Sequence, residues 1–283
     1  MDHFFYGWYL KCQSDTQSLA VIPAIHNAKG KRNCSIQVIT DNDSWTVPFA
    51  ADSFHFHKVK KDLSIGENRF GEKGIHLDIR TPRLTVSGDL DFGPLFPLQY
   101  DIMGPFALVP FMECRHSVWS MRHTVSGNVC VNGESYSFED AWGYWEGDRG
   151  RSFPKEYIWT QCCFRGGALM LSVADIPMAG FHFTGIIGVV LWRGKEYRMA
   201  TYLGARVVRV QNKTIRVIQG SLELEVRLLE APERPLMAPV KGNMVRTIYE
   251  SVSCRVFYRF RRKGCTLFAF ETDKASLEYE FPM

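Results

Sequence analysis

The chain has 283 residues, of which 46% are hydrophobic and 23% are charged, a balance that suits a folded protein and excludes wholesale disorder. Its formal net charge is only +4 and its basic residues are scattered, which argues against a nucleic-acid-binding protein. Aromatic residues reach 13% of the chain, and β-strands and apolar ligand sites both use them.

Signals for export and for metal binding are weak. The opening MDHFFYGWYL lacks the basic start and the long apolar stretch of a signal peptide, and the longest apolar run, 185–192, is too short to span a bilayer. Of the eight cysteines, none forms a CxxC pair. We therefore expect reduced thiols in a cytoplasmic protein without a transmembrane segment, while peripheral contact with a membrane remains open.

Taken in chain order, the pattern is β almost throughout. Short runs rich in Val, Ile, Thr and aromatic residues alternate with turn residues, and Asn132-Gly133, Asn212-Lys213 and Lys263-Gly264 each predict a hairpin turn. No window shows the periodicity of a long amphipathic helix. The clearest predicted strands are 35–40, 84–87, 128–131 and 157–163. We predict an all-β, antiparallel protein with few helices.

The prolines of residues 92–110 predict a long connection between strands. With the length of the chain, this favours two β-domains, an N-terminal domain over residues 1–125 and a C-terminal domain over residues 126–283.

Residues 143–163 combine charges and aromatic side chains more densely than any other segment. Glu146 and Asp148 lie there among tryptophans and tyrosines, and Gly147 and Gly150 leave little bulk around Asp148. One interpretation is a turn in which the acids pair with Arg149 and Arg151. The other is a buried carboxylic acid that acts as a general acid beside an apolar pocket. From composition alone, the ion-paired turn is favoured.

Two further groups of residues are candidates for a site. In a strand over 157–163, Tyr157, Trp159 and Gln161 share one face, and the strand-like segment 113–124 carries His116. His55 and His57 also share a strand face and could hold a metal, but an exposed edge strand is the favoured interpretation. We therefore predict no metal and no other cofactor.

The runs HSVWSMRHTVSGNVCVNG (116–133) and GYWEGDRGRSFPKEYIWTQC (143–162) resemble the tocopherol cyclase family, particularly its bacterial members. The opening FYGWYLK and the later YRMATYLGARV extend the resemblance over nearly the whole chain. The resemblance implies two lipocalin-like β-barrels, as in the related carotenoid hydratase-like proteins. It also implies an isomerase that protonates the alkene of a prenylated hydroquinone, an isoprenoid compound, so that the phenolic oxygen closes a chromanol ring without a cofactor.

We assign the groups that this reaction requires to residues of the segments that carry the resemblance. Asp148, or else Glu146, is the expected proton donor, with aromatic rings to stabilise a cation and polar groups to hold a phenol. The residues expected to bind the substrate are Trp145, Tyr157, Trp159, Gln161, His116, Arg149 and Arg151. A lipocalin-like protein that only binds a hydrophobic small molecule is the alternative, and hydration of a polyene is a third interpretation.

Overall fold

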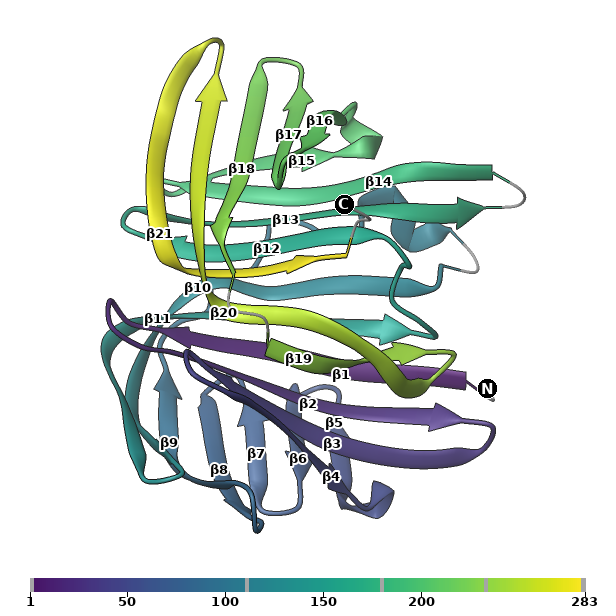
Figure 1. Cartoon of the computed structure of the whole chain (residues 1–283), viewed down its shortest axis with the longest axis vertical. Helices are drawn as coiled ribbons and strands as arrows, with labels where there is room; N and C mark the ends of the chain where they lie inside the picture. Colours follow the sequence, from purple (N-terminus) through teal and green to yellow (C-terminus); the bar gives the residue numbers. More distant parts are fainter. Residues whose placement is uncertain (1–2, 110–111, 179–180, 232–233, 281–283) are drawn as a thin grey trace. The chain divides into compact units, whose positions relative to one another are not determined.

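The computed structural model describes residues 3–109, 112–178, 181–231 and 234–280. Its strands form two antiparallel sheets of eleven and ten strands, both curled into barrel-like shapes (Figure 1). The predicted all-β fold with two lipocalin-like barrels is confirmed. The helices of these residues are three short 3₁₀ segments, η1 (Ala51–Ser53), η2 (Gly104–Leu108) and η3 (Thr201–Leu203). None of the helices in these ranges is long and apolar enough to cross a membrane.

Unit 1 contains the eleven-stranded sheet and comprises Met1–Gln99, Met112–Phe153 and Pro235–Thr247. The strand order is β4-β3-β2-β1-β11-β10-β9-β8-β7-β6-β5, so that β1, the first strand, pairs with β11, the last. The strands are β1 (His3–Gln13), β2 (Ser18–Ala28), β3 (Lys31–Thr40), β4 (Ser44–Phe49), β5 (Phe54–His57), β6 (Asp62–Ile65), β7 (Asn68–Gly71), β8 (Gly74–Arg80), β9 (Thr85–Phe92), β10 (Cys114–Val131) and β11 (Glu134–Gly150).

Unit 2 contains the ten-stranded sheet and comprises Tyr100–Phe111, Pro154–Arg234 and Ile248–Met283. Its order, β15-β14-β13-β12-β21-β20-β18-β17-β16, again pairs the first strand of the unit, β12, with the last, β21. The strands of this sheet are β12 (Tyr157–Phe164), β13 (Gly167–Met178), β14 (Phe181–Trp192), β15 (Lys195–Ala200), β16 (Arg206–Gln211), β17 (Thr214–Gln219), β18 (Leu222–Glu230), β19 (Arg234–Val240), β20 (Asn243–Arg262) and β21 (Cys265–Tyr279). β19 pairs with β20 outside the order above, and residues 235–240 of β19 and 243–247 of β20 belong to unit 1.

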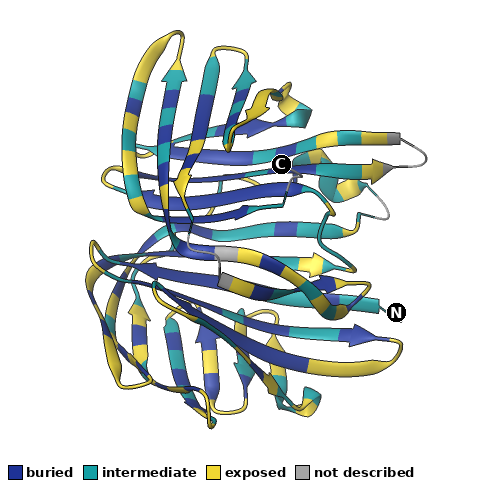
Figure 2. Cartoon of the chain, viewed as in Figure 1, coloured by how far each residue is buried: buried dark blue, intermediate teal, exposed yellow. Residues whose placement is uncertain are grey.

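Each sheet has a core of its own on its inner face, because alternate residues of a strand point to opposite sides. In unit 1 the inner residues of β1 are Trp8, Leu10 and Cys12, and Trp145 of β11 joins them. In unit 2, Ile158 and Cys162 of β12 pack into the second core. Buried residues therefore alternate with more exposed ones along many strands (Figure 2).

The predicted hairpin turns are confirmed. Asn132 and Gly133, which join β10 to β11, have φ values of 50° and 88°, and Lys263 and Gly264 have 49° and 78°. Both residues of such a tight turn need positive φ, which asparagine and glycine adopt at little cost. Asn212 and Lys213 form the same kind of turn between β16 and β17. These turns fix where each pair of strands begins.

The compact units divide the chain differently from the predicted domains 1–125 and 126–283. Val125 lies in the middle of β10, a strand that continues for six more residues to its hairpin turn and so cannot separate two domains. Residues 93–109 of the long connection expected over 92–110 hold no strand, and Pro110 lies outside the described residues. Residues 235–247, where β19 pairs with β20, also belong to unit 1, and we call this segment the returning hairpin. The side-chain Nε2 of Gln37 donates to the carbonyl of Met237 in this segment over 3.3 Å.

Candidate functional site

The β10–β11 hairpin places the histidine and both candidate acids side by side. If the residues of β10 and β11 paired one by one from the Asn132-Gly133 turn without interruption, His116 would lie opposite Arg149. Register shifts in β10, between Val118 and Ser120, between Ser120 and His123, and between Val125 and Gly127, instead place His116 opposite Asp148. Because opposite residues of a pair share a face, these irregularities bring His116 to the acids rather than to the arginine.

This face of β11 points away from the core of unit 1, and we call it the outer face. Trp145 belongs to the core, so its neighbours Tyr144 and Glu146 lie on the outer face, as does Asp148. The outer face is nevertheless buried here, because Tyr144 is 1% and Glu146 is 4% exposed. The carboxyl of Glu146 is therefore held out of water.

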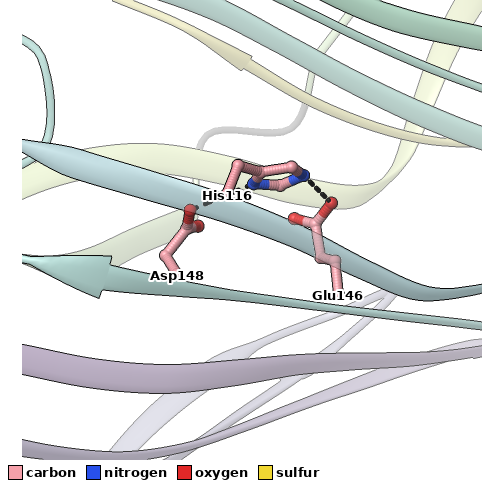
Figure 3. A group of neighbouring side chains, drawn as sticks. All are labelled: His116, Glu146 and Asp148. Atoms are coloured by element: carbon pink, nitrogen blue, oxygen red, sulfur yellow. Dashed lines mark hydrogen bonds and ion pairs between the residues drawn. The ribbon is translucent and has the colours of Figure 1, made fainter. Parts of the chain in front are cut away.

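His116 lies between the two carboxyls, one at each nitrogen of its ring (Figure 3). Its Nδ1 forms a hydrogen bond of 3.0 Å with Oδ1 of Asp148. Its Nε2 lies 2.9 Å from Oε2 of Glu146, close enough for an ion pair, although the N–H direction does not meet hydrogen-bond geometry. Two more donors complete the cluster: the Tyr144 hydroxyl donates to Glu146 Oε2, and the Cys114 thiol donates to Asp148 Oδ1 over 3.3 Å.

The electrostatics of the cluster favour bound protons. Burial acts to lower the pKa of His116, but the nearby carboxylates of Glu146 and Asp148 outweigh it and raise that pKa well above its ordinary value. Burial raises the pKa of Glu146, against the opposing effect of His116. Burial, with the charge of Asp148, also raises the pKa of the Cys114 thiol. The cluster therefore keeps its protons to a higher pH than the same residues would in water.

The same three residues also meet the first requirement of a metal site, because one donor atom from each of His116, Glu146 and Asp148 lies within 4.8 Å of the others. The sequence analysis weighed His55 and His57 for this role and did not predict this grouping. Here, however, the carboxyls contact opposite edges of the ring, whereas one ion could take only one ring nitrogen. His55 and His57 lie exposed on β5, the terminal strand of the sheet, as expected of an edge strand.

The other predicted residues from the first segment lie away from the cluster. Trp145 is fully buried in the core of unit 1, where its ring centroid lies 4.9 Å from that of Trp8 and 5.2 Å from that of Trp119. Arg149 is exposed and alternates with Asp148, so it lies on the core side of β11. Arg151 is exposed just beyond the strand. The alternative in which Asp148 pairs with these arginines is not observed, since its described partners are His116 and Cys114.

Tyr157, Trp159 and Gln161 belong to β12 of unit 2. They share one face of that strand, as predicted, and all are buried. This face lies opposite the core of unit 2, because Ile158 and Cys162 point into that core. The Tyr157 hydroxyl donates to Oε2 of Glu278 on β21, and Gln161 Nε2 contacts the Cys163 sulfur over 3.4 Å.

Three members of these groups were not predicted from the sequence: Cys114, Tyr144 and Glu278. Tyr144 and Cys114 could have been found, because each precedes a predicted site residue by two positions and so shares its strand face. Glu278 lies 121 positions after Tyr157 in the sequence, so no local sequence pattern indicates their hydrogen bond.

The fold has solved counterparts, although no family model and no curated protein matches the sequence. CghA, solved with Sch210972, superposes with a TM-score of 0.65 at 8% identity, over 99% of this chain and 89% of its own. Kievitone hydratase from Nectria haematococca gives 0.58 at 9% identity, over 99% and 89%. A protein named ATTH from Nitrosomonas europaea gives 0.55 at 13% identity, over 99% and 93%. At these identities the similarity establishes the shared fold.

Proposed function

We propose that the cluster of His116, Glu146 and Asp148 is the acid–base centre of an enzyme that protonates a carbon–carbon double bond of an apolar small molecule. One observation carries the proposal: an imidazole held between two carboxyls on a buried face. Titratable groups perturbed by burial and by a specific charged partner gather at functional sites. A carboxyl at each nitrogen of the ring allows this cluster to hold a proton on one side and to deliver one on the other.

The proton balance of the cluster suits general acid catalysis. With His116 protonated and one of the two carboxyls neutral, the cluster has no net charge, which is the state that burial favours. We assign delivery of the proton to Asp148, whose side chain is 23% exposed, compared with 6% for Glu146. Asp148 is thus the carboxyl that a ligand can reach, while Glu146 and His116 hold the proton behind it.

In the reaction that the resemblance to tocopherol cyclases suggests, the Asp148 O–H bond breaks and its proton forms a C–H bond with the alkene. The phenolic oxygen of the same substrate then attacks the tertiary cation, forming a C–O bond. The phenolic proton returns to the Asp148 carboxylate. Substrate and product are isomers, so no oxidant, reductant or second substrate enters the balance.

Hydration is the second candidate function, and the fold shared with kievitone hydratase favours it. There the same acid would protonate the double bond and a water molecule would supply the oxygen nucleophile. The two reactions differ in the mass of the product, since cyclisation leaves the mass unchanged and hydration adds one water.

The test is incubation of the full chain with a prenylated hydroquinone, followed by chromatography and mass spectrometry. We expect a chromanol of unchanged mass from the wild type. Asp148→Asn should slow its formation by about 10²–10⁴-fold, the usual contribution of a general acid, with Glu146→Gln assayed in parallel. The matched control is Asp175→Asn, which removes the carboxyl of an exposed aspartate–histidine pair with His182 in unit 2.

Three results would count against the proposal. If Asp148→Asn and Glu146→Gln both turn over substrate like the wild type, neither residue is the acid. If the Asp175→Asn control loses activity equally, the losses do not report on the cluster. If the wild type binds the hydroquinone and a panel of isoprenoid alkenes but converts none of them, the protein is a lipocalin-like binder.

A further inference from the structure

The turn between β5 and β6, residues 58–61, presents an apolar side chain to solvent. Val59 in this turn is 89% exposed, the highest value among the large hydrophobic residues of the described ranges. Single exposed valines are common on protein surfaces. This one differs in its neighbours, because Lys58 and Lys60 lie on either side of it and Lys61 follows. The turn therefore combines an exposed apolar tip with positive charge.

Of the three lysines in this turn, Lys61 is neutralised by an acid. Its Nζ lies 2.9 Å from Oε1 of Glu72, in the neighbouring β7–β8 turn. Lys58 and Lys60 are exposed, and neither side chain forms an ion pair or a hydrogen bond with a described residue. Two positive charges beside Val59 are therefore available to an external partner.

The strand that leads into the turn adds aromatic surface. Phe56 of β5 is 37% exposed, although it is a large apolar residue. Its ring lies 5.3 Å from that of Tyr6 and 5.7 Å from that of Trp8, both on β1. These contacts already hold the ring in place, so a partner that binds there loses little affinity to ordering it. The hairpin thus carries two exposed apolar side chains, Phe56 and Val59.

Leu108 in η2 of unit 2 provides a contrast, because it is the next most exposed large hydrophobic residue of the described ranges, at 85%. Residues 104–109 around it carry no charged side chain. The strength of binding to a lipid surface scales with the apolar area that is buried and with the attraction to anionic lipids. Leu108 offers only the first of these, whereas the β5–β6 turn offers both.

We propose that the β5–β6 turn docks unit 1 on an anionic lipid surface. Val59 enters the boundary between head groups and acyl chains, and Lys58 and Lys60 contact the negative charges of the head groups. Residues 54–62 contain no arginine. Lysine suits a lipid surface better than a protein carboxylate, because its ammonium is a hydrated point charge on a flexible stem, whereas arginine has the planar fork that pairs with a carboxylate.

This docking does not depend on the function proposed for the His116 cluster, and it can be measured without a substrate. Co-sedimentation of the full chain with vesicles of an equal mixture of phosphatidylcholine and phosphatidylserine tests it, with vesicles of phosphatidylcholine alone as the charge control. We expect the mixed vesicles to bind the protein more tightly. The binding should weaken as salt is added, because exposed charges are screened.

The charges are tested by Lys58→Gln/Lys60→Gln, which should weaken binding to the mixed vesicles by about 30-fold, since each lysine near an anionic surface contributes about fivefold. The matched control is Arg83→Gln. It removes an exposed charge from the β8–β9 turn, at the other end of β8 from the β7–β8 turn, and should retain the affinity.

The apolar tip is tested by Val59→Asp, which should weaken binding to the mixed vesicles by about tenfold or more, because it removes the inserted side chain and adds a negative charge. Leu108→Asp is the control of nearly equal exposure and should leave the affinity unchanged. Both positions are exposed, so neither substitution disturbs a core.

No binding to the mixed vesicles at low ionic strength would overturn the proposal, as would equal binding to phosphatidylcholine alone. Losses in the Arg83→Gln and Leu108→Asp controls that match those of the turn variants would also overturn it. If the chain binds polyglutamate in a way that depends on Lys58 and Lys60, but does not bind the vesicles, the turn belongs to an acidic protein partner and not to a lipid surface.

Discussion

Each unit of the chain buries a glutamate that accepts a hydrogen bond from a tyrosine, and the surroundings of the two glutamates differ. Glu146 in unit 1 receives the Tyr144 hydroxyl from its own strand and also faces His116. Glu278 in unit 2 receives the Tyr157 hydroxyl from the neighbouring strand β12. The one histidine in the sequence of unit 2, His182, pairs with Asp175 at the exposed β13–β14 hairpin.

This difference in surroundings indicates that the two tyrosine–glutamate pairs have different roles. A buried hydrogen bond between a tyrosine and a glutamate can fix two strands to each other, because a satisfied buried carboxyl specifies geometry. Adding a histidine with a second carboxyl at its far nitrogen creates a group that exchanges protons among several atoms. The comparison therefore predicts that chemistry depends on Glu146 and its neighbours, and that Glu278 is structural.

The largest expected effect is on turnover. Glu146→Gln should lower the rate of the proposed reaction by up to about 10²–10⁴-fold, since it removes an acid of the cluster. Glu278→Gln should change the rate little, because it keeps the shape of the side chain and its ability to accept from Tyr157. Rate measurements at saturating substrate compare the two, and equal losses would erase the distinction between the two glutamates.

A large effect on stability is expected at His116. His116→Leu should lower the free energy of unfolding at pH 7 by about 3–5 kcal/mol, because it leaves the carboxyls of Glu146 and Asp148 without their buried counter-charge. The control, His182→Leu, breaks an exposed pair and should cost less than about 1 kcal/mol. Urea denaturation measures both, and similar losses would show that burial of the cluster is unimportant.

The cluster should also make stability fall as the pH rises. The folded-state pKa of His116 is raised, so its contribution is complete below its unfolded value and is lost as the pH rises through the folded value. Glu146, whose pKa is also raised, acts in the same direction because the folded state binds the proton more tightly. Denaturation between pH 5 and 9 should give the wild type a steeper decline than the His116→Gln/Glu146→Gln variant; parallel curves would contradict this.

The smallest effects are expected from the tyrosines. Tyr144→Phe and Tyr157→Phe each remove the hydrogen bond to a buried glutamate and should each cost about 1 kcal/mol of stability. They should differ in catalysis, because the Tyr144 hydroxyl lowers the pKa of Glu146. Tyr144→Phe should therefore move the alkaline limb of the activity profile to higher pH, and Tyr157→Phe should leave it in place. An equal shift in both variants would place the two glutamates in one site.

The fold could be predicted from the sequence because its turns are local. Asn132-Gly133 and Lys263-Gly264 set hairpins through the backbone angles of two adjacent residues, and the strands between them alternate in the ordinary way. The division of the chain into units could not be predicted, because β10 runs through the predicted domain boundary at residue 125 and residues 235–247 belong to unit 1. Contacts between residues so far apart leave no periodic signal.

For the candidate site, the sequence analysis named Glu146, Asp148 and His116 as expected site residues but did not predict that they lie in contact. The turn alone would align His116 with Arg149, and the irregularities of β10 that change this alignment have no signature in the residues. Trp145 and Arg149 were grouped with the acids because they are adjacent to them in sequence. Adjacent residues of a strand point to opposite faces, so this grouping brought together two different surfaces of the sheet.

The returning hairpin has a consequence for how the protein is made. Gln37 contacts Met237, 200 positions away, and Nδ1 of His3 lies 2.7 Å from the carbonyl oxygen of Lys241. A nascent chain that has emerged only as far as Phe153 therefore has every strand of the eleven-stranded sheet but lacks the segment that completes unit 1. Completion of this unit must wait until most of unit 2 has left the ribosome, and a fragment ending at Phe153 should be prone to aggregation.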